Sequence, residues 1–316
     1  MSHDQIAVTP GGRGLTWGAI ALALMLCLTW GFNQIAIKLV LREIPPYTQA
    51  ALRSAGALLV ILTIARVRGV RMFERDGTLP AGLFVGAVFG IEFLLIYHGL
   101  ELTSASRAVI FLYTMPFFVA LGAYLFLGER LRATQWAGLA ISFAGVAVAI
   151  GLPQPDVTAG VPTGDLLIVA GALLWAATTI IVKATTLRHS APEKALGYQV
   201  GLSIPILGVA AVVSGETIPQ MPGALTISLL LFQAVWVVGI TFVLWLALIK
   251  TYSASKLSAF TFITPLFGVA AGYLIMGDHL TPAFGAAALL VIAGLVLVNR
   301  PGKAAATDPL LNVIKT

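Results

Sequence analysis

The sequence predicts an all-α membrane protein with ten transmembrane helices arranged as two inverted five-helix repeats. Three observations support this fold class: the composition, the spacing of apolar segments and an internal repeat. Of the 316 residues, 59% are hydrophobic and only 10% are charged. Soluble domains carry roughly 25% charged residues. A helix crosses the hydrocarbon core of a bilayer with about 20 apolar residues, so this chain has room for many crossings.

Ten hydrophobic segments are bounded by charged residues, glycine or proline, and each is long enough to form a membrane-spanning helix. The segments are 17–40, 46–65, 80–100, 104–127, 133–151, 164–187, 195–214, 225–249, 254–276 and 281–299. The first exceeds the length of a signal-peptide core, so we expect it to be retained as a span.

A polar, proline-rich linker separates two groups of five segments. This linker reads LPQPDVTAGVPT and covers residues 152–163. The predicted parts are a cytoplasmic tail over 1–16, a first five-helix repeat over 17–151, the linker, a second five-helix repeat over 164–299 and a cytoplasmic tail over 300–316.

The two groups of five segments resemble each other in sequence. LTWGFNQIAIKLV (28–40) and LLWAATTIIVKAT (173–185) each place a lysine eight residues after a tryptophan. Later, YTMPFFVALGAYLFLGERL (113–131) aligns with FITPLFGVAAGYLIMGDHL (262–280). Two matching stretches in the same order indicate duplication. Because each copy has an odd number of helices, the second copy enters the membrane in the opposite orientation.

The distribution of lysine and arginine supports this topology. With the N-terminus in the cytoplasm, the inner loops and tails contain fourteen of these residues, whereas the outer loops contain only Arg42 and Arg107. Cytoplasmic loops of membrane proteins carry such an excess, so we expect both termini to be cytoplasmic. The basic residues lie in short loops rather than on a soluble face, which predicts a lipid bilayer and no nucleic acid as partner.

These duplicated motifs resemble the drug/metabolite transporter superfamily, and within it the EamA type. The shared features are WG…K in the first helix of a repeat and P…G…GE.L in the fourth. The resemblance covers about 17–151 and 164–299. It implies alternating access around a central cavity, transport of small metabolites across a bacterial inner membrane, and a structural role for the GE.L ends. The second repeat has WAAT for WGFN and GDHL for GERL, which leaves open whether Lys38 and Lys183 have the same role.

Ionisable residues within the spans are the first candidates for a substrate or coupling site. Each costs about 2.5–3.5 kcal/mol to insert and usually faces protein or a water-filled cavity. Inverted-repeat transporters place their site near the midplane between the repeats. Glu92 is the leading candidate, about twelve residues into the third span. A carboxylate at this depth needs a proton or a basic partner, which Arg53 or Lys38 could supply. The pair could be a structural ion pair or a proton-coupling or substrate-amine site.

Three further ionisable candidates lie nearer the ends of the spans. Lys38 and Lys183 could face the pathway, or their stems could extend to the membrane interface. His98 has a near-neutral intrinsic pKa that suits proton relay, and the alternative is a hydrogen-bonded residue at a helix end.

Aromatic and amide side chains complete the predicted site. They could line a cavity, or they could pack against lipid and neighbouring helices. These residues are Trp30, Asn33, Tyr113, Trp175, Tyr198, Gln233 and Trp236. Pro116 and Pro265 occupy matching positions in the repeats and predict kinks that serve either gating or a fixed helix shape. Gly82, Gly86 and Gly90 are four residues apart and predict close helix packing.

The sequence lacks the motifs of ATP hydrolysis and of common hydrolases, and its histidines and single cysteine are scattered. It therefore predicts no cofactor, no metal and no enzymatic activity. We expect a secondary transporter of small-molecule substrates, with amino acids and related compounds as the favoured class. Transport would use protons as the coupling ion, exchange, or downhill flow. The alternative is an intramembrane enzyme acting on a lipid-linked substrate, with Glu92 and His98 as acid and base.

Overall fold

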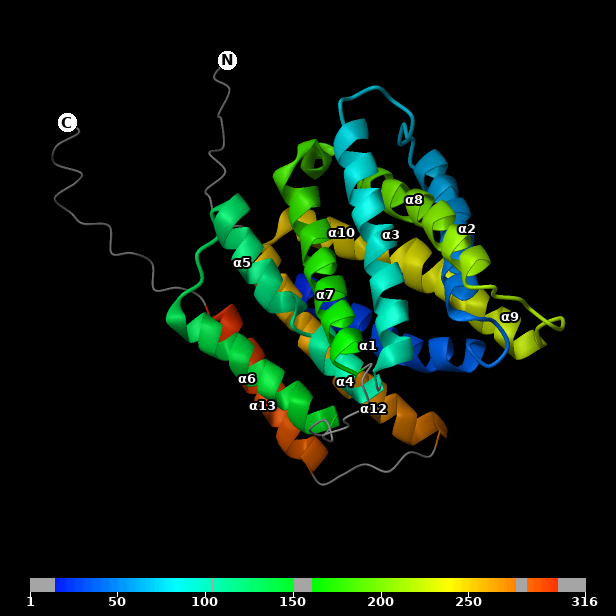
Figure 1. Cartoon of the computed structure of the whole chain (residues 1–316). Helices are drawn as coiled ribbons and strands as arrows, with labels where there is room; N and C mark the ends of the chain where they lie inside the picture. The colour runs from blue at the N-terminus through cyan, green and yellow to red at the C-terminus, as the bar shows by residue number, and fades with distance from the viewer. Residues whose placement is uncertain (1–14, 104, 151–160, 277–282, 301–316) are drawn as a thin grey trace, which may run out of the picture.

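The protein is an all-helical, multi-pass membrane protein. The computed structural model describes residues 15–103, 105–150, 161–276 and 283–300, and these residues form helices and connecting loops without any strand (Figure 1). Within them, nine helical stretches are long and apolar enough to cross a membrane. The tenth predicted segment, Ala283–Asn299, forms an apolar helix of 17 residues. The all-α membrane fold is therefore confirmed.

Seven of the predicted segments form single helices close to their expected bounds. They are α1 (Trp17–Val40), α2 (Pro46–Val67), α3 (Leu79–Leu102), α6 (Ala133–Ile150), α7 (Val161–Ala184), α8 (Pro192–Val213) and α13 (Ala283–Asn299). Because α7 begins at Val161, the last residues of the predicted linker are helical. Residues 152–160 and most of both predicted tails lie outside the described residues.

Three predicted segments are interrupted. The fourth is divided into α4 (Ala105–Leu112) and α5 (Met115–Leu127). The eighth contains α9 (Ala224–Leu231), the π-helix η2 (Phe232–Thr241) and α10 (Phe242–Thr251). The ninth contains α11 (Ala254–Ala259), the 3₁₀-helix η3 (Phe260–Ile263), α12 (Thr264–Ala271) and the π-helix η4 (Gly272–Met276). A further 3₁₀-helix, η1 (Thr186–His189), follows α7.

Pro116 and Pro265 lie in the first turns of α5 and α12, respectively. The first turn of a helix has no intrahelical hydrogen bond for proline to remove, and proline is common there. The structure thus places each predicted kink at the start of a new helix, where the segment is interrupted, rather than inside a continuous helix.

Glycine allows two helix pairs to pack at short distance. Gly82, Gly86 and Gly90 face α8, and a Cβ at Gly90 would lie 2.5 Å from Ile206 Cδ1. The predicted packing role of this glycine series is therefore confirmed. In the second pair, α6 and α13 lie side by side (Figure 1). A Cβ at Gly138 would lie 2.7 Å from the carbonyl oxygen of Gly294, so the two backbones are almost in contact.

At one end of the molecule, each half of the chain caps a helix of the other half. Glu216, which follows α8, accepts hydrogen bonds from the backbone N–H groups of Tyr47 (3.0 Å) and Thr48 (2.7 Å) at the start of α2. In the opposite direction, Glu43 accepts one from the N–H of Gly223 (2.6 Å), directly before α9. The hydrogen bond from Gly223 holds the pKa of Glu43 below its usual value. These contacts satisfy donors that a helix leaves unpaired at its N-terminus.

At the other end, α8 is joined to the loop between α2 and α3. Lys194 is buried, and its Nζ donates to Asp76 Oδ2 (2.9 Å) and to the carbonyl oxygen of Glu74 (3.0 Å). Arg68 forms an ion pair with Glu193. Hydrogen bonds from Thr78 and Lys194 hold the pKa of Asp76 well below its usual range. Both ends of the α2–α8 contact are therefore fixed by charged groups.

Replacing Glu216 by alanine should weaken the attachment of α2. No side chain caps α2 at Pro45, so the loss of Glu216 leaves its first N–H groups without their acceptor. We expect the free energy of unfolding to fall by about 1 kcal/mol, the usual value of an N-terminal cap. Thermal unfolding in detergent would show this as a lower Tm. Glu101→Ala, which removes an exposed carboxylate from α3, is the control, and an equal loss in both variants would contradict the capping role.

Candidate functional site

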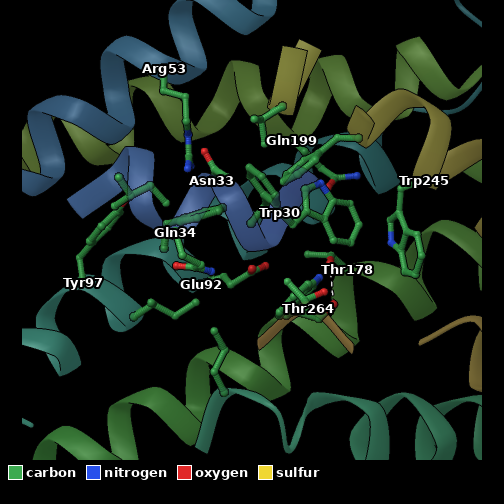
Figure 2. A pocket seen from close by; sticks show the side chains of 18 of the residues that line it. Trp30, Asn33, Gln34, Arg53, Glu92, Tyr97, Thr178, Gln199, Trp245 and Thr264 are labelled. Atoms are coloured by element: carbon green, nitrogen blue, oxygen red, sulfur yellow. Dashed lines mark hydrogen bonds between the residues drawn. The ribbon is translucent and has the colours of Figure 1, made fainter. Parts of the chain in front are cut away.

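A central cavity of about 220 Å³ lies between the two halves of the chain (Figure 2). Its walls come from α1, α2, α3 and α4 of the first half, and from α7, α8, η2, α10 and α12 of the second. Drug-sized ligands usually occupy pockets of about 300–1,000 Å³, so a cavity of this size suits a small solute. Two exposed lining residues, Gln34 and Leu100, lie at one end of the cavity. Leu196 near the start of α8, and Trp245 and Leu246 on α10, line the other end and are buried.

Among the buried polar residues that line this cavity, three come from three neighbouring helices of the first half. They are Asn33 on α1, Arg53 on α2 and Glu92 on α3, and each is at most 7% exposed. Within the described part of the chain, Asn33 Oδ1, Arg53 Nε and Glu92 Oε2 have no hydrogen-bond partner. Arg53 attracts Glu92 electrostatically, and its guanidinium lies over the ring of Phe93, 4.7 Å from the centroid. The lining thus includes an unpaired donor on an arginine and unpaired acceptors on an amide and a carboxyl group.

The buried end of the cavity is aromatic. The Trp30 ring meets Phe242 and Trp245 edge-on, with centroid distances of 5.7 and 5.1 Å. Trp30 is held in place because its Nε1 donates to Thr241 Oγ1 (2.9 Å). Figure 2 shows Trp30 and Trp245 on the side of the cavity away from Tyr97. A ligand can therefore place polar groups near Arg53 and Glu92 while an apolar part contacts the rings.

The structure brings six of the twelve predicted substrate or coupling residues to this cavity. These are Trp30, Asn33, Arg53, Glu92, Tyr113 and Trp175. They come from five spans, which are the first four and the sixth. Arg53, rather than Lys38, is the basic residue near Glu92, since Lys38 is exposed and does not line the cavity.

The other six lie elsewhere and contact other parts of the protein or the exterior. Lys38 is exposed, and His98 is exposed and within 3.2 Å of Glu101. Lys183 interacts with Glu129 at the end of α5, at 3.5 Å. Tyr198, Gln233 and Trp236 contact Thr78, Gln49 and Thr29 respectively. Because His98 and Glu92 do not share the cavity, their arrangement does not favour the alternative acid–base pair of an intramembrane enzyme.

Several lining residues were absent from the predicted set, among them Tyr97, Thr178 and Thr179. The internal repeat contains a signal for the two threonines. Adding the offset of 145 that relates Trp30 to Trp175 takes Asn33 and Gln34 to Thr178 and Thr179. The same comparison at an offset of 149 aligns GIEF (90–93) with GITF (239–242), so Thr241 occupies the position of Glu92.

A model of the EamA-like transporter family matches residues 17–151 and 162–300. The chain belongs to the EamA-like transporter family. The predicted resemblance to this branch of the drug/metabolite transporter superfamily is therefore confirmed. The match to both halves also agrees with the internal similarity found in the sequence.

Relatives of this EamA-like transporter extend over most of its length. It is 30% identical over 301 residues to "Uncharacterized transporter YvbV" of Bacillus subtilis (strain 168), covering 90% of this chain and 92% of that one. It is 27% identical over 295 residues to "Probable amino-acid metabolite efflux pump" of Escherichia coli (strain K12), covering 87% and 93%. A crystal structure at 19% identity superposes with a TM-score of 0.76 over 89% of this chain and 98% of that one, which shows a shared fold.

Proposed function

We propose that this EamA-like transporter moves amino acids or related small zwitterions across the inner membrane as a secondary transporter with alternating access. The observation that carries this proposal is the set of buried, unpaired polar atoms on Asn33, Arg53 and Glu92 around one cavity. Burying a charge without a partner is expensive, and proteins rarely do it where no ligand or water is bound. A bound zwitterion would supply both kinds of missing partner, a carboxylate for Arg53 and an ammonium group for Glu92 and Asn33.

The chemistry of the three atoms matches the two ends of an amino acid. Glu92 Oε2 and Asn33 Oδ1 are acceptors, and an ammonium group has three donors to satisfy them. Arg53 offers a donor on a planar guanidinium, the group that binds carboxylates best. The favourable energy of binding then comes from charge-assisted hydrogen bonds in a site with little water.

The contacts between helices support two inverted repeats of five helices each. In such a pair, helices that occupy the same place in the two repeats meet at the pseudo-two-fold axis. The second and seventh spans (α2 and α8) are in contact, and so are the fifth and tenth (α6 and α13). Other contacts occur twice, once in each direction between the repeats. The third span packs on the seventh (α3 on α8), and the eighth packs on the second (η2 on α2). Likewise, the fourth span packs on the sixth (α5 on α7), and the ninth packs on the first (α12 on α1).

The name of one relative, "Probable amino-acid metabolite efflux pump", points to the same class of substrate. The energy source would be a proton gradient, exchange or downhill flow. An even balance of charge in the cavity, with one arginine and one glutamate, favours a solute without net charge.

Transport in proteoliposomes would test the substrate class. After a thermal-shift screen of amino acids, uptake of a labelled hit is measured in competition with its two matched analogues, one lacking the amino group and one lacking the carboxylate. Because each missing group leaves a buried charge unpaired, we expect either analogue to compete at least about tenfold more weakly. Equal competition by all three compounds would contradict a zwitterion site.

A further inference from the structure

A second cluster of buried polar groups lies outside the cavity, around Glu129 at the end of α5. Its Oε2 accepts hydrogen bonds from the hydroxyl groups of Ser253 (2.8 Å) and Ser255 (2.9 Å) and from the Ser255 N–H (3.2 Å). Its Oε1 accepts one from the Ala254 N–H (2.9 Å). Glu129 is only 8% exposed. One carboxylate from the first half thus holds the start of α11 in the second half.

Lys183 completes this cluster from a third helix. At the end of α7, its Nζ lies 3.5 Å from Glu129 Oε1 and donates to the carbonyl oxygen of Tyr252 at 2.5 Å. Burial opposes ionisation of Glu129, but Lys183 and the hydrogen bonds from residues 253–255 outweigh it and lower its pKa. The carboxylate therefore stays charged at neutral pH, and it joins α5, α7 and α11.

The cluster lies beyond the closed end of the central cavity. On α7, Thr179 lines the cavity and Lys183 follows four residues later, about 6 Å further along the helix. On α10, Leu246 lines the cavity and Tyr252 follows directly after the helix. The exposed lining residues Gln34 and Leu100 are at the opposite end. The helices that meet at Glu129 thus converge on the side of the cavity whose lining residues Leu196, Trp245 and Leu246 are buried.

We infer that Glu129 is a latch that keeps the cavity closed at this end. The resemblance in sequence implied only a structural role for the GE.L motif of residues 128–131. Among the described residues, the partners of the Glu129 side chain all belong to the second repeat, so its carboxylate joins the two repeats instead of bracing one of them internally. In alternating access, contacts between the repeats at a closed end must break for that end to open. The latch rests on the proposed alternating access and is independent of the substrate class.

Thiol labelling of the cavity from each side of the membrane would test the latch. The reporter is Thr178→Cys, which lines the cavity, in a Cys27→Ser background that removes the single native cysteine. A membrane-impermeant maleimide is added to sealed vesicles of either orientation. Glu129→Gln keeps the side-chain size but removes the charge. Glu74→Gln is the matched control, because Glu74 lies in a loop at the same end and its carboxylate pairs with Arg71 of the same loop, while the backbone carbonyl that binds Lys194 is unchanged by the substitution.

We expect Glu129→Gln to raise labelling from the latch end about tenfold, and to lower labelling from the end with Gln34 and Leu100, because the population shifts toward the other state. Glu74→Gln should behave as the parent. Ser255→Ala, which removes one hydrogen bond, should give a smaller change in the same direction if Glu129→Gln folds poorly by size-exclusion chromatography.

One result would overturn the latch alone: the reporter reacts from the Gln34 end, but neither Glu129→Gln nor Ser255→Ala changes its labelling from either end. A reporter that reacts from neither end in any variant would show that the cavity is not a pathway. That result would overturn the latch together with alternating access, whereas loss of the zwitterion preference would leave the latch intact.

Discussion

Replacing Glu92 by glutamine is expected to reduce transport of the zwitterionic substrate by about 10- to 100-fold in kcat/KM, the value of a charge-assisted hydrogen bond of about 1.5–3 kcal/mol. Glutamine has nearly the same volume, so the cavity keeps its shape. It cannot compensate an ammonium group, and it leaves the buried Arg53 without a nearby negative charge.

The measurement is initial uptake in proteoliposomes containing equal amounts of each variant. Glu101→Gln is the matched control, since Glu101 lies on the same helix but is exposed and pairs with His98. A site role also predicts that Glu92→Gln loses the preference for the amino acid over its analogue without an amino group. If Glu92 serves only as a structural partner of Arg53, both compounds should lose transport equally, and the double variant with Arg53→Gln should recover stability but leave selectivity unchanged.

Replacing Gly294 by alanine is expected to lower the free energy of unfolding by about 1–3 kcal/mol, as overpacking usually does. A Cβ at this position would meet the Gly138 carbonyl oxygen and the hydroxyl group of Ser142, and it would lie 2.6 Å from the Ser142 backbone nitrogen. Since two of these atoms belong to the α6 backbone, side-chain rotation cannot relieve the contact. The helices must move apart, and they lose dispersion contacts along their whole length.

Gly285→Ala provides an internal control on the same helix. A Cβ there has no atom within 4 Å, so only the helix propensity changes, in favour of alanine. Thermal unfolding of the two purified variants in the same detergent would show a lower Tm for Gly294→Ala and an unchanged or higher one for Gly285→Ala. Equal Tm values would indicate that α6 and α13 tolerate separation without cost.

The hydrophobic segments, together with the charged residues, glycines and prolines that bound them, predicted the positions of the helices well. Bilayer thickness sets a similar length for every span. They did not predict the interruptions in the fourth, eighth and ninth segments. A broken span keeps the same apolar composition as a continuous one, and its backbone groups are satisfied by neighbouring helices. Pro116 and Pro265 gave the only local signal of these interruptions, and it located two of the three segments.

For the site, depth in the membrane was a better guide than residue type. Glu92 and Arg53 were predicted from the cost of burying charge, and both line the cavity. Tyr198 and Trp236 were predicted from their aromatic side chains, like Trp30 and Tyr113, but they lie on other helix faces. Their spans are apolar on all sides, so the sequence shows no difference between a face toward the cavity and one toward lipid. Comparing the two repeats residue by residue would have identified Thr178 and Thr179.

The reciprocal capping by Glu43 and Glu216 has a consequence for biogenesis. The N–H groups of Tyr47 and Thr48 at the start of α2 donate to Glu216, and this acceptor is synthesised more than 160 residues later. The first half alone therefore leaves the ribosome with a helix end that only water or lipid headgroups can satisfy. Its final packing must wait for the second half, so the halves mature together instead of docking as finished units.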